Sequence, residues 1–231
     1  MTILKVRHIT HYTYHQPVGF GAHRILFRPR DSYDQRLLQS SLAVLPEPSD
    51  LHWIHDVFGN CVAVAQFRTM STQLRFETSI VLDHTRLMPL EFRGEAGAAK
   101  WPFDYDDEIL PDLAALRVRQ YADDGGVTMA WARRFVDGAS PRDTADILER
   151  MTHAIHADFT YRRRIDRGTQ TPAETLASQS GSCRDFALLM MEAARALGFA
   201  ARFVTGYIYV PLRAGAENLG GGATHAWAQV F

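Results

Sequence analysis

The sequence predicts an α+β protein in which an antiparallel β sandwich comes first and a domain of helices and strands follows. Up to about residue 88, short runs alternate between apolar and polar positions and are separated by turn residues, which is typical of sandwich strands. From residue 140 the apolar period becomes helical. The last elements come in the order helix, helix, strand, strand, which favours an α+β domain over a doubly wound sheet.

The composition indicates a globular protein and excludes several function classes. The chain has 231 residues, of which 46% are hydrophobic, so it can bury a core. A net charge of -1 and a pI near 6.8 favour neither nucleic acid nor an anionic membrane as a partner. No apolar run approaches the length of a membrane span, and the N-terminus lacks a secretory signal, so we expect a cytoplasmic location.

The chain has two cysteines, Cys61 and Cys183, in segments of different character. They are too far apart to suggest a disulfide framework. The sequence contains no CxxC pair and no HExxH motif. We therefore expect no metal and no cofactor.

Residues 1–88 are expected to form the β-sandwich domain. The opening run ILKVRHITHYTYH alternates, and it is followed by LLQSSLAVLP, DLHWIHDVFGN, CVAVAQFR and QLRFETSIVLD. The FGN triplet before CVAVAQF indicates a hairpin turn.

Residues 89–139 are expected to form a linker. It contains the acidic, proline-bearing run WPFDYDDEILPD and one short helix, VTMAWARRFV, ended by Asp137-Gly138.

Residues 140–231 are expected to form the second domain, which opens with a helix. Ser140 is the expected N-cap, with Pro141 in the first turn and Asp143 near the positive end of the dipole. One buried stripe is expected, at Leu148, Met151, Ile155 and Phe159. A polar connection, TYRRRIDRGTQTPAETLASQSGS, leads to a second helix. Two strands, AARFVTGYIYV and THAWAQVF, follow that helix and are joined by the loop PLRAGAENLGGGA.

The second helix begins at Cys183. A clean apolar face is expected from residues at helical spacing, Phe186, Leu189, Met190, Ala193, Ala194 and Leu197. Gly198 is expected to end the helix, and Ser182 with Asp185 has the arrangement of a capping box. Cys183 therefore lies in the first turn, on the side of the apolar face.

Two side chains, Cys183 and His225, are candidates for a nucleophile and its base. The N–H groups of a helix's first turn have no intrahelical partner, and together with the dipole they stabilise a thiolate and could hold an oxyanion. His225 shares a strand face with Trp227, Gln229 and Phe231, and packing of that strand on the helix would bring its imidazole to the thiol. The alternatives are a buried cysteine that acts as a small hydrophobe and a packed, hydrogen-bonded histidine. Spacing alone does not decide between them.

The combination of these motifs resembles the core of bacterial transglutaminase-like cysteine peptidases. That family's pattern is Gly-x-Cys-x-Asp-Phe-Ala, a helix ending in Ala-Leu-Gly, then Ala-Arg, a Gly-Tyr strand and a strand with His-Ala-Trp. The matching residues are Gly181, Cys183, Asp185-Phe186-Ala187, Ala196-Leu197-Gly198, Ala201-Arg202, Gly206-Tyr207 and His225-Ala226-Trp227. The opening strands, with HYTYHQPV and RPRD, resemble the β domain that often precedes this core in bacteria.

The resemblance implies a papain-like arrangement, in which a cysteine at a helix N-terminus faces a sheet that carries a histidine and an acid. Cys183 would be the nucleophile, with its backbone N–H in the oxyanion hole, and His225 would be the general base and acid. The motif does not fix the second oxyanion donor. Trp227 lies on the His225 face and could line the substrate pocket, although packing is the simpler interpretation.

The acid of the implied Cys-His-Asp triad has no match in the chain. It is usually an Asp on the next strand, and the sequence ends at Phe231, six residues after His225. Asp185 does not replace it, because it lies two residues along the helix and points elsewhere. We therefore expect a core truncated at its C-terminal end, with weak or no activity. The exposed sheet edge is expected to form a homodimer contact or to leave a disordered end.

The implied activity is thiol-dependent acyl transfer. Cys183 would form a thioester with a peptide or carboxamide carbonyl, and water or an amine would release the acyl group. Hydrolysis, which the bacterial resemblance favours, would make the protein a cysteine peptidase or amidase with a peptide or protein substrate. Amine attack would make it a protein-crosslinking transglutaminase. A third alternative is a non-catalytic protein-binding module on the same scaffold, which the missing acid favours.

Overall fold

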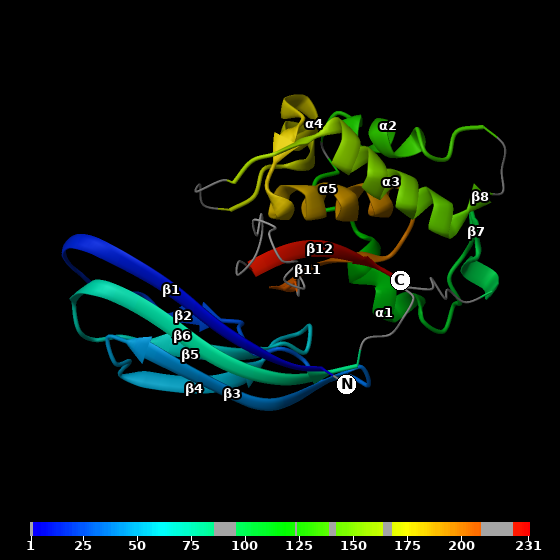
Figure 1. Ribbon diagram of the computed structural model, residues 1–231. Coiled ribbons are helices and arrows are strands. Elements are labelled where there is room, and N and C mark those ends of the chain that lie inside the picture. The colour runs from blue at the N-terminus through cyan, green and yellow to red at the C-terminus, as the bar shows by residue number, and fades with distance from the viewer. Residues whose placement is uncertain (1, 86–95, 123, 139–141, 164–167, 209–223) are drawn as a thin grey trace, which may run out of the picture. The chain divides into compact units, whose positions relative to one another are not determined.

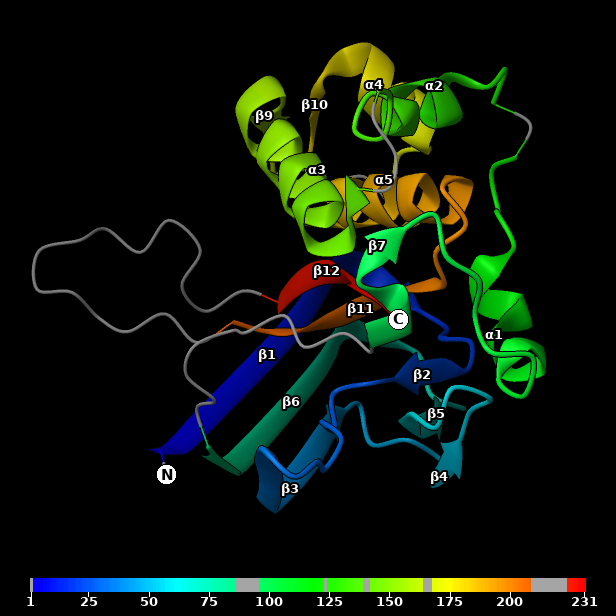
Figure 2. The same ribbon diagram turned by 90° about the vertical axis from the view of Figure 1, so that its right-hand side faces the viewer.

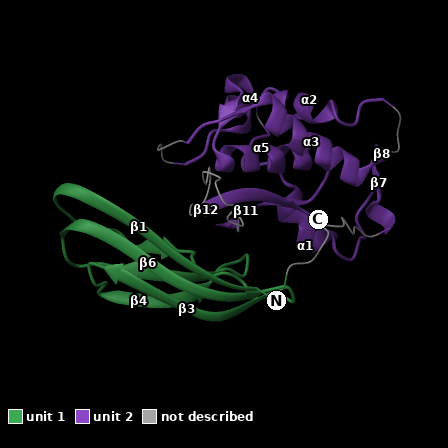
Figure 3. Ribbon diagram, in the orientation of Figure 1, with its two compact units in different colours: residues 1–91 green, residues 92–231 purple. Residues whose placement is uncertain are grey.

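The computed structural model describes residues 2–85, 96–122, 124–138, 142–163, 168–208 and 224–231. The chain folds into two compact units, residues 1–91 and residues 92–231 (Figure 3). Within the described ranges, no helix is long and apolar enough to cross a membrane.

Unit 1 is an antiparallel β sandwich, as the sequence predicts (Figure 1). One sheet has the strand order β1-β6-β3 and the other has the order β2-β5-β4. The strands are β1 (Thr2–Val18), β2 (His23–Ile25), β3 (Gln35–Leu45), β4 (Asp50–His55), β5 (Cys61–Gln66) and β6 (Ser71–His84). Ala63 and Ala65 of β5 are buried in one apolar cluster with Leu74 and Phe76 of β6. The two sheets therefore pack face to face.

The hairpin turn between β4 and β5 contains the FGN triplet, as predicted. One carboxylate oxygen of Asp56 accepts hydrogen bonds from the backbone N–H groups of Phe58 (2.9 Å) and Asn60 (2.8 Å). Gly59 has a φ of +74°, in the left-handed region that favours glycine. The side chain of Asp56 and the glycine together fix the turn and hence the register of the hairpin.

Unit 2 is built in layers around helix α5 (Cys183–Ala196). On one side of α5 lies the antiparallel pair β11 (Ala201–Tyr207) and β12 (Thr224–Val230). On the other side lie α2 (Val127–Arg133), α3 (Thr144–Asp158) and α4 (Pro172–Ser178) (Figure 1, Figure 2). The remaining elements are a 3-10 helix (Ala96–Ala98), α1 (Leu110–Arg117), the pair β7 (Lys100–Trp101) and β8 (Arg142–Asp143), and the pair β9 (Thr160–Tyr161) and β10 (Ser180–Gly181). This arrangement confirms the predicted α+β class.

Helix α5 has the predicted apolar face in the core, and it is also buried on its other sides. Strands cover one side of the helix and three other helices cover the opposite side. Residues all round it are consequently buried, including the charged side chains of Glu192 and Arg195. Gly198, with a φ of +95°, follows the end of the helix as predicted.

The opposite charges of Glu192 and Arg195 form an ion pair inside this core. Their charged groups lie 3.3 Å apart. The Glu192 carboxylate accepts hydrogen bonds from the backbone N–H groups of Gln120 (3.2 Å) and Tyr121 (3.1 Å). The Arg195 guanidinium donates to the carbonyl oxygen of Ala201 (2.8 Å). The pair therefore ties α5 to the segment before α2 and to the start of β11.

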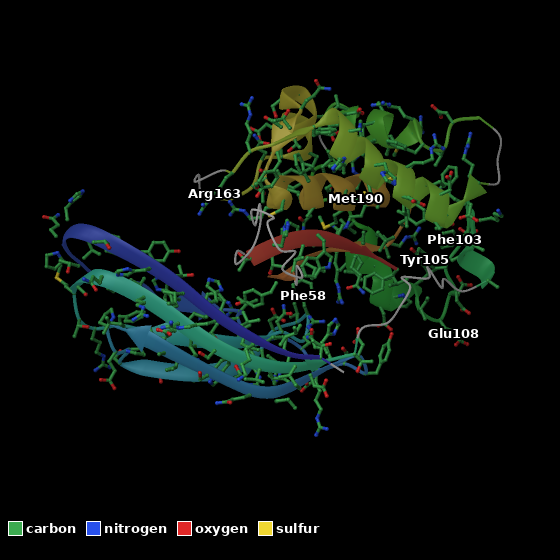
Figure 4. The ribbon with its side chains drawn as sticks, viewed as in Figure 1. Phe58, Phe103, Tyr105, Glu108, Arg163 and Met190 are labelled. Carbon is green, nitrogen blue, oxygen red and sulfur yellow. The ribbon has the colours of Figure 1, made fainter. Side chains whose placement is uncertain are left out.

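The described part of residues 92–139 packs within unit 2 and contains two α-helices, α1 and α2, where the sequence indicated one. Trp131 of α2 and the following Phe135 are buried in the main apolar cluster of this unit. The Tyr105 hydroxyl donates to the carbonyl oxygen of Phe231 (2.6 Å) and accepts from the N–H of Ala200 (2.8 Å), so it joins the ends of β11 and β12 (Figure 4).

Helix α3 has Asp143 as its N-cap and not Ser140, which lies outside the described residues. The Asp143 carboxylate accepts hydrogen bonds from the N–H groups of Ala145 (3.0 Å) and Asp146 (3.2 Å). Strand β8, which includes this N-cap, is held in extended backbone by its pairing with β7. The helix therefore begins later than the sequence indicated.

Replacing Glu192 with alanine is expected to lower the free energy of unfolding by about 3–5 kcal/mol, because Arg195 would stay buried without its partner. Urea denaturation followed by circular dichroism measures this change. Glu149→Ala is the control, since Glu149 is exposed, and it should change the value by less than about 0.5 kcal/mol. Equal stability of the two variants would contradict the role assigned to Glu192.

Candidate active site

The candidate nucleophile Cys183 is the first residue of α5, and its side chain is half-buried. Ser182 is the N-cap, as predicted. One carboxylate oxygen of the fully buried Asp185 accepts from the N–H (2.8 Å) and the hydroxyl (2.8 Å) of Ser182, and the other accepts from the N–H of Gln170 (2.7 Å). Asp185 therefore fixes the turn that places Cys183, which is a structural role.

The backbone before this turn packs too closely for any side chain at position 181. A Cβ added to Gly181 would lie 2.9 Å from Cβ of Asp185 and 3.2 Å from Cε1 of Phe186. Gly181 pairs with Tyr161 in the β9–β10 ladder. The glycine of the Gly-x-Cys motif therefore lets that ladder approach the first turn of α5.

The sequence analysis missed helix α4, which lies in the segment interpreted as a polar connection. Thr171 is its N-cap, and the Thr171 hydroxyl accepts from the N–H of Glu174 (3.2 Å) while the Glu174 carboxylate accepts from the N–H of Thr171 (2.8 Å). Pro172 occupies the first helical position. This capping box is legible in the sequence TPAE and could have predicted the helix.

The order of the chain places His225 at the same end of unit 2 as Cys183. Helix α5 is about 21 Å long and strand β11 is about 23 Å long, and a tight connection at Gly198 joins them, so β11 returns along the helix. Ala201 pairs with Val230 at the start of β11, and Gly206 pairs with His225 near its end. The start of β12 consequently lies beside the N-terminal end of α5 (Figure 1).

The two faces of β12 have different surroundings. Ala228 and Val230 pack against the cluster that contains α5, and Ala226 shares their face and is buried. His225 and Trp227 alternate to the opposite face, where His225 is half-buried and Trp227 is 40% exposed. The structure therefore brings Cys183 and His225 to one end of α5, but the Cβ of His225 points to the sheet face away from the helix.

The Nδ1 atom of His225 is buried and has no hydrogen-bond partner among the described residues. Through that atom, the imidazole is bonded neither to Cys183 nor to any other described side chain. On the inner sheet face at the same end lies Tyr207, a residue of the family pattern to which the sequence assigned no role. Burial raises the pKa of the Tyr207 hydroxyl to about 12, so it is protonated at neutral pH. The predicted loop between the two strands lies outside the described residues.

Two cavities in the described part of unit 2 lie away from this end of α5. One, of about 360 Å³, borders Ala196 and Leu197 at the opposite end of the helix, together with Trp101. The other, of about 470 Å³, borders Tyr105 and Arg117. Neither is lined by Cys183 or His225, so the site proposed here rests on the chemistry of these side chains and not on a cavity.

Comparison with known proteins identifies the family. Residues 4–83 match the family described as the bacterial transglutaminase-like N-terminal region. Residues 129–231 match the transglutaminase-like superfamily. Together the two matches cover most of the chain, with a transglutaminase-like core in residues 129–231. The family that the motifs around Cys183 and His225 indicated is thereby confirmed.

Relatives of this transglutaminase-like chain occur in mycobacteria. Uncharacterized proteins of Mycobacterium tuberculosis and Mycobacterium bovis are each 28% identical to it over 244 residues, covering 98% of this chain and 73% of the relative. An uncharacterized protein of Mycobacterium leprae is 23% identical over 235 residues, covering 99% of this chain and 79% of the relative.

A solved structure shares the fold. The crystal structure of a candidate cysteine protease from Cytophaga hutchinsonii matches with a TM-score of 0.69 at 19% identity, over 99% of this chain and 72% of that one. At this level of identity the likeness shows the fold alone. It confirms the predicted α+β fold over 99% of this chain.

Gly181→Ala is expected to lower the free energy of unfolding by about 1–3 kcal/mol, because the new methyl group would overlap Asp185 and Phe186 at the start of α5. Thermal and urea denaturation measure the loss. Gly97→Ala is the matched control, since a Cβ at Gly97 would meet no atom within 4 Å. A Gly181→Ala variant as stable as this control would show that the β9–β10 ladder does not constrain the turn before Cys183.

Proposed function

We propose that this transglutaminase-like protein is a thiol-dependent acyl-transfer enzyme that hydrolyses peptide or carboxamide bonds of a peptide or protein substrate. The observation that supports it is the placement of Cys183 in the first turn of α5, at the end of the helix beside the start of β12, which carries His225. Helix α5 and strand β12 pack against each other, and the proposed chemistry further requires the thiol and the imidazole to come within hydrogen-bond reach.

In the proposed reaction, His225 takes the thiol proton and the sulfur of Cys183 attacks the carbonyl carbon. The resulting tetrahedral oxyanion would be held by first-turn N–H groups, including that of Cys183. Collapse breaks the carbon–nitrogen bond, and the imidazolium gives its proton to the leaving amine. Water then attacks the thioester, its proton passing through His225, and the acid and the free thiol are released.

The histidine needs both ring nitrogens for this cycle, one for the thiol and one for an acid that orients the ring. The buried Nδ1 of His225 has no partner among the described residues and is therefore available for one of these roles. The acid stays the Asp that the family resemblance implies on a following strand. We assign no residue of the described chain to it.

A second candidate function is a non-catalytic protein-binding module on the same scaffold. The lack of an acid bonded to Nδ1 of His225 among the described residues favours it, since a catalytic triad orients its histidine through an acid. A crosslinking transglutaminase differs from the hydrolase only in the acceptor that attacks the thioester.

The cytoplasmic location expected from the sequence stays a prediction.

The rate of Cys183 alkylation by iodoacetamide as a function of pH tests the proposed pair. An ordinary thiol reacts slowly below its pKa of about 8.5, whereas a thiolate paired with imidazolium still reacts fast near about pH 6. We expect His225→Ala to slow alkylation near about pH 6 by about tenfold or more, with little effect near about pH 9. Mass spectrometry assigns the label, and Cys183→Ser gives the background from Cys61.

The exposed His153→Ala is the control for this experiment and should leave the pH profile unchanged. An ordinary thiol profile in the wild type, unaffected by His225→Ala, would refute the catalytic pair and favour the binding module. If the pair is present, release of ammonia would indicate amidase activity, and new termini in a peptide library would indicate peptidase activity.

A further inference from the structure

The cross-strand neighbour of His225 is a glycine whose side-chain space is filled by an indole. Gly206 pairs directly with His225 in the β11–β12 ladder. A Cβ added to Gly206 would lie 2.7 Å from Cη2 and 3.4 Å from Cζ3 of Trp227. The φ of Gly206 is outside the left-handed region, so its backbone does not require glycine. The requirement comes from the six-membered ring of Trp227, which lies against the Gly206 backbone.

This contact limits where the imidazole of His225 can go. Directly opposed residues of an antiparallel pair have their Cβ positions about 4.5–5.5 Å apart on one face. Opposite a glycine, the imidazole could lean over β11 and occupy the empty space. The Trp227 ring already occupies it, and Trp227 shares the face of His225 because the two are two residues apart on β12.

We propose that Trp227 is a positioning residue, whose indole fills the space above Gly206 and thereby directs the His225 side chain away from β11. The inference rests on the proposed function, because a fixed imidazole matters most if it serves Cys183. It replaces the expectation that Trp227 lines the substrate pocket. It also explains why Gly206 and Trp227 occur together: the indole lies where a side chain at position 206 would be.

The size of the effect follows from rotamer counting. A side chain with three staggered χ1 wells of similar energy spends about a third of its time in any one of them. Opening the space above Gly206 should therefore reduce the productive fraction of His225 about threefold, and more if the imidazole packs into the opened space. A pocket-lining role would instead change substrate binding and leave the imidazole where it is.

Nuclear Overhauser effects between the His225 ring protons and the Gly206 Hα protons test the positioning directly. In the isotope-labelled wild type we expect no such effect, because the indole separates the two groups. In Trp227→Ala we expect it to appear, together with a loss of about threefold or more in His225-dependent Cys183 alkylation. Gln229→Ala, on the same face of β12 and two residues beyond Trp227, is the control and should change neither.

A rescue variant separates positioning from general loss of structure. Gly206→Val in the Trp227→Ala background refills the space with a side chain suited to a strand, and should remove the new effect and restore the alkylation rate. Unchanged ring contacts of His225 in a folded Trp227→Ala protein would overturn the proposal. New ring contacts in a protein whose alkylation never depended on His225 would support the positioning and refute the proposed function.

Discussion

The burial of α5 on every side is the constraint on which the rest of unit 2 depends. A helix with strands on one side and helices on the other can keep a charged side chain only where a partner is built in, because an unpaired buried charge costs several kcal/mol. Toward the C-terminal end of α5, the charges of Glu192 and Arg195 are paired with each other. In the first turn, the Asp185 carboxylate accepts a hydrogen bond from the N–H of Ser182. The half-buried Cys183 lies where this enclosed helix begins.

That position is less favourable for a thiolate than an isolated helix end would be. The buried carboxylate of Asp185 lies in the same turn, and it already uses the N–H groups of Ser182 and Gln170. Its negative charge opposes a second negative charge nearby. The helix dipole, worth about 0.3–1 kcal/mol at an accessible site, has to act against it. In the proposed enzyme, the positive charge that stabilises a thiolate at Cys183 would therefore come largely from an imidazolium, which makes the orientation of His225 more important than the helix end itself.

Local sequence patterns predicted the helix and strands that carry the motif. Tertiary packing decides how these elements are covered and which of their faces meet, and local patterns do not predict that. Helix α5, its Ser182 cap and the strands bearing Gly206 and His225 follow from periodicity and capping residues. The enclosure of α5 does not, because Glu192 and Arg195 look like solvated positions until both covering layers are known. Helix α4 was missed although its capping box was legible. The relation of His225 to Cys183 depends on which face of β12 meets α5, and alternation alone leaves both faces equivalent.

Strand β12 pairs with β11 along one edge and, among the described residues, with no strand along the other. The N–H and C=O groups of such an edge favour pairing with a further strand, whether from another copy of the chain or from a different segment. A residue opposed to His225 across that new pair would share its face, with a Cβ separation of about 5 Å. The Trp227 indole above Gly206 already directs the imidazole toward this side. In the proposed enzyme, a strand on this edge with an acid opposite His225 would therefore reach a ring that is already oriented.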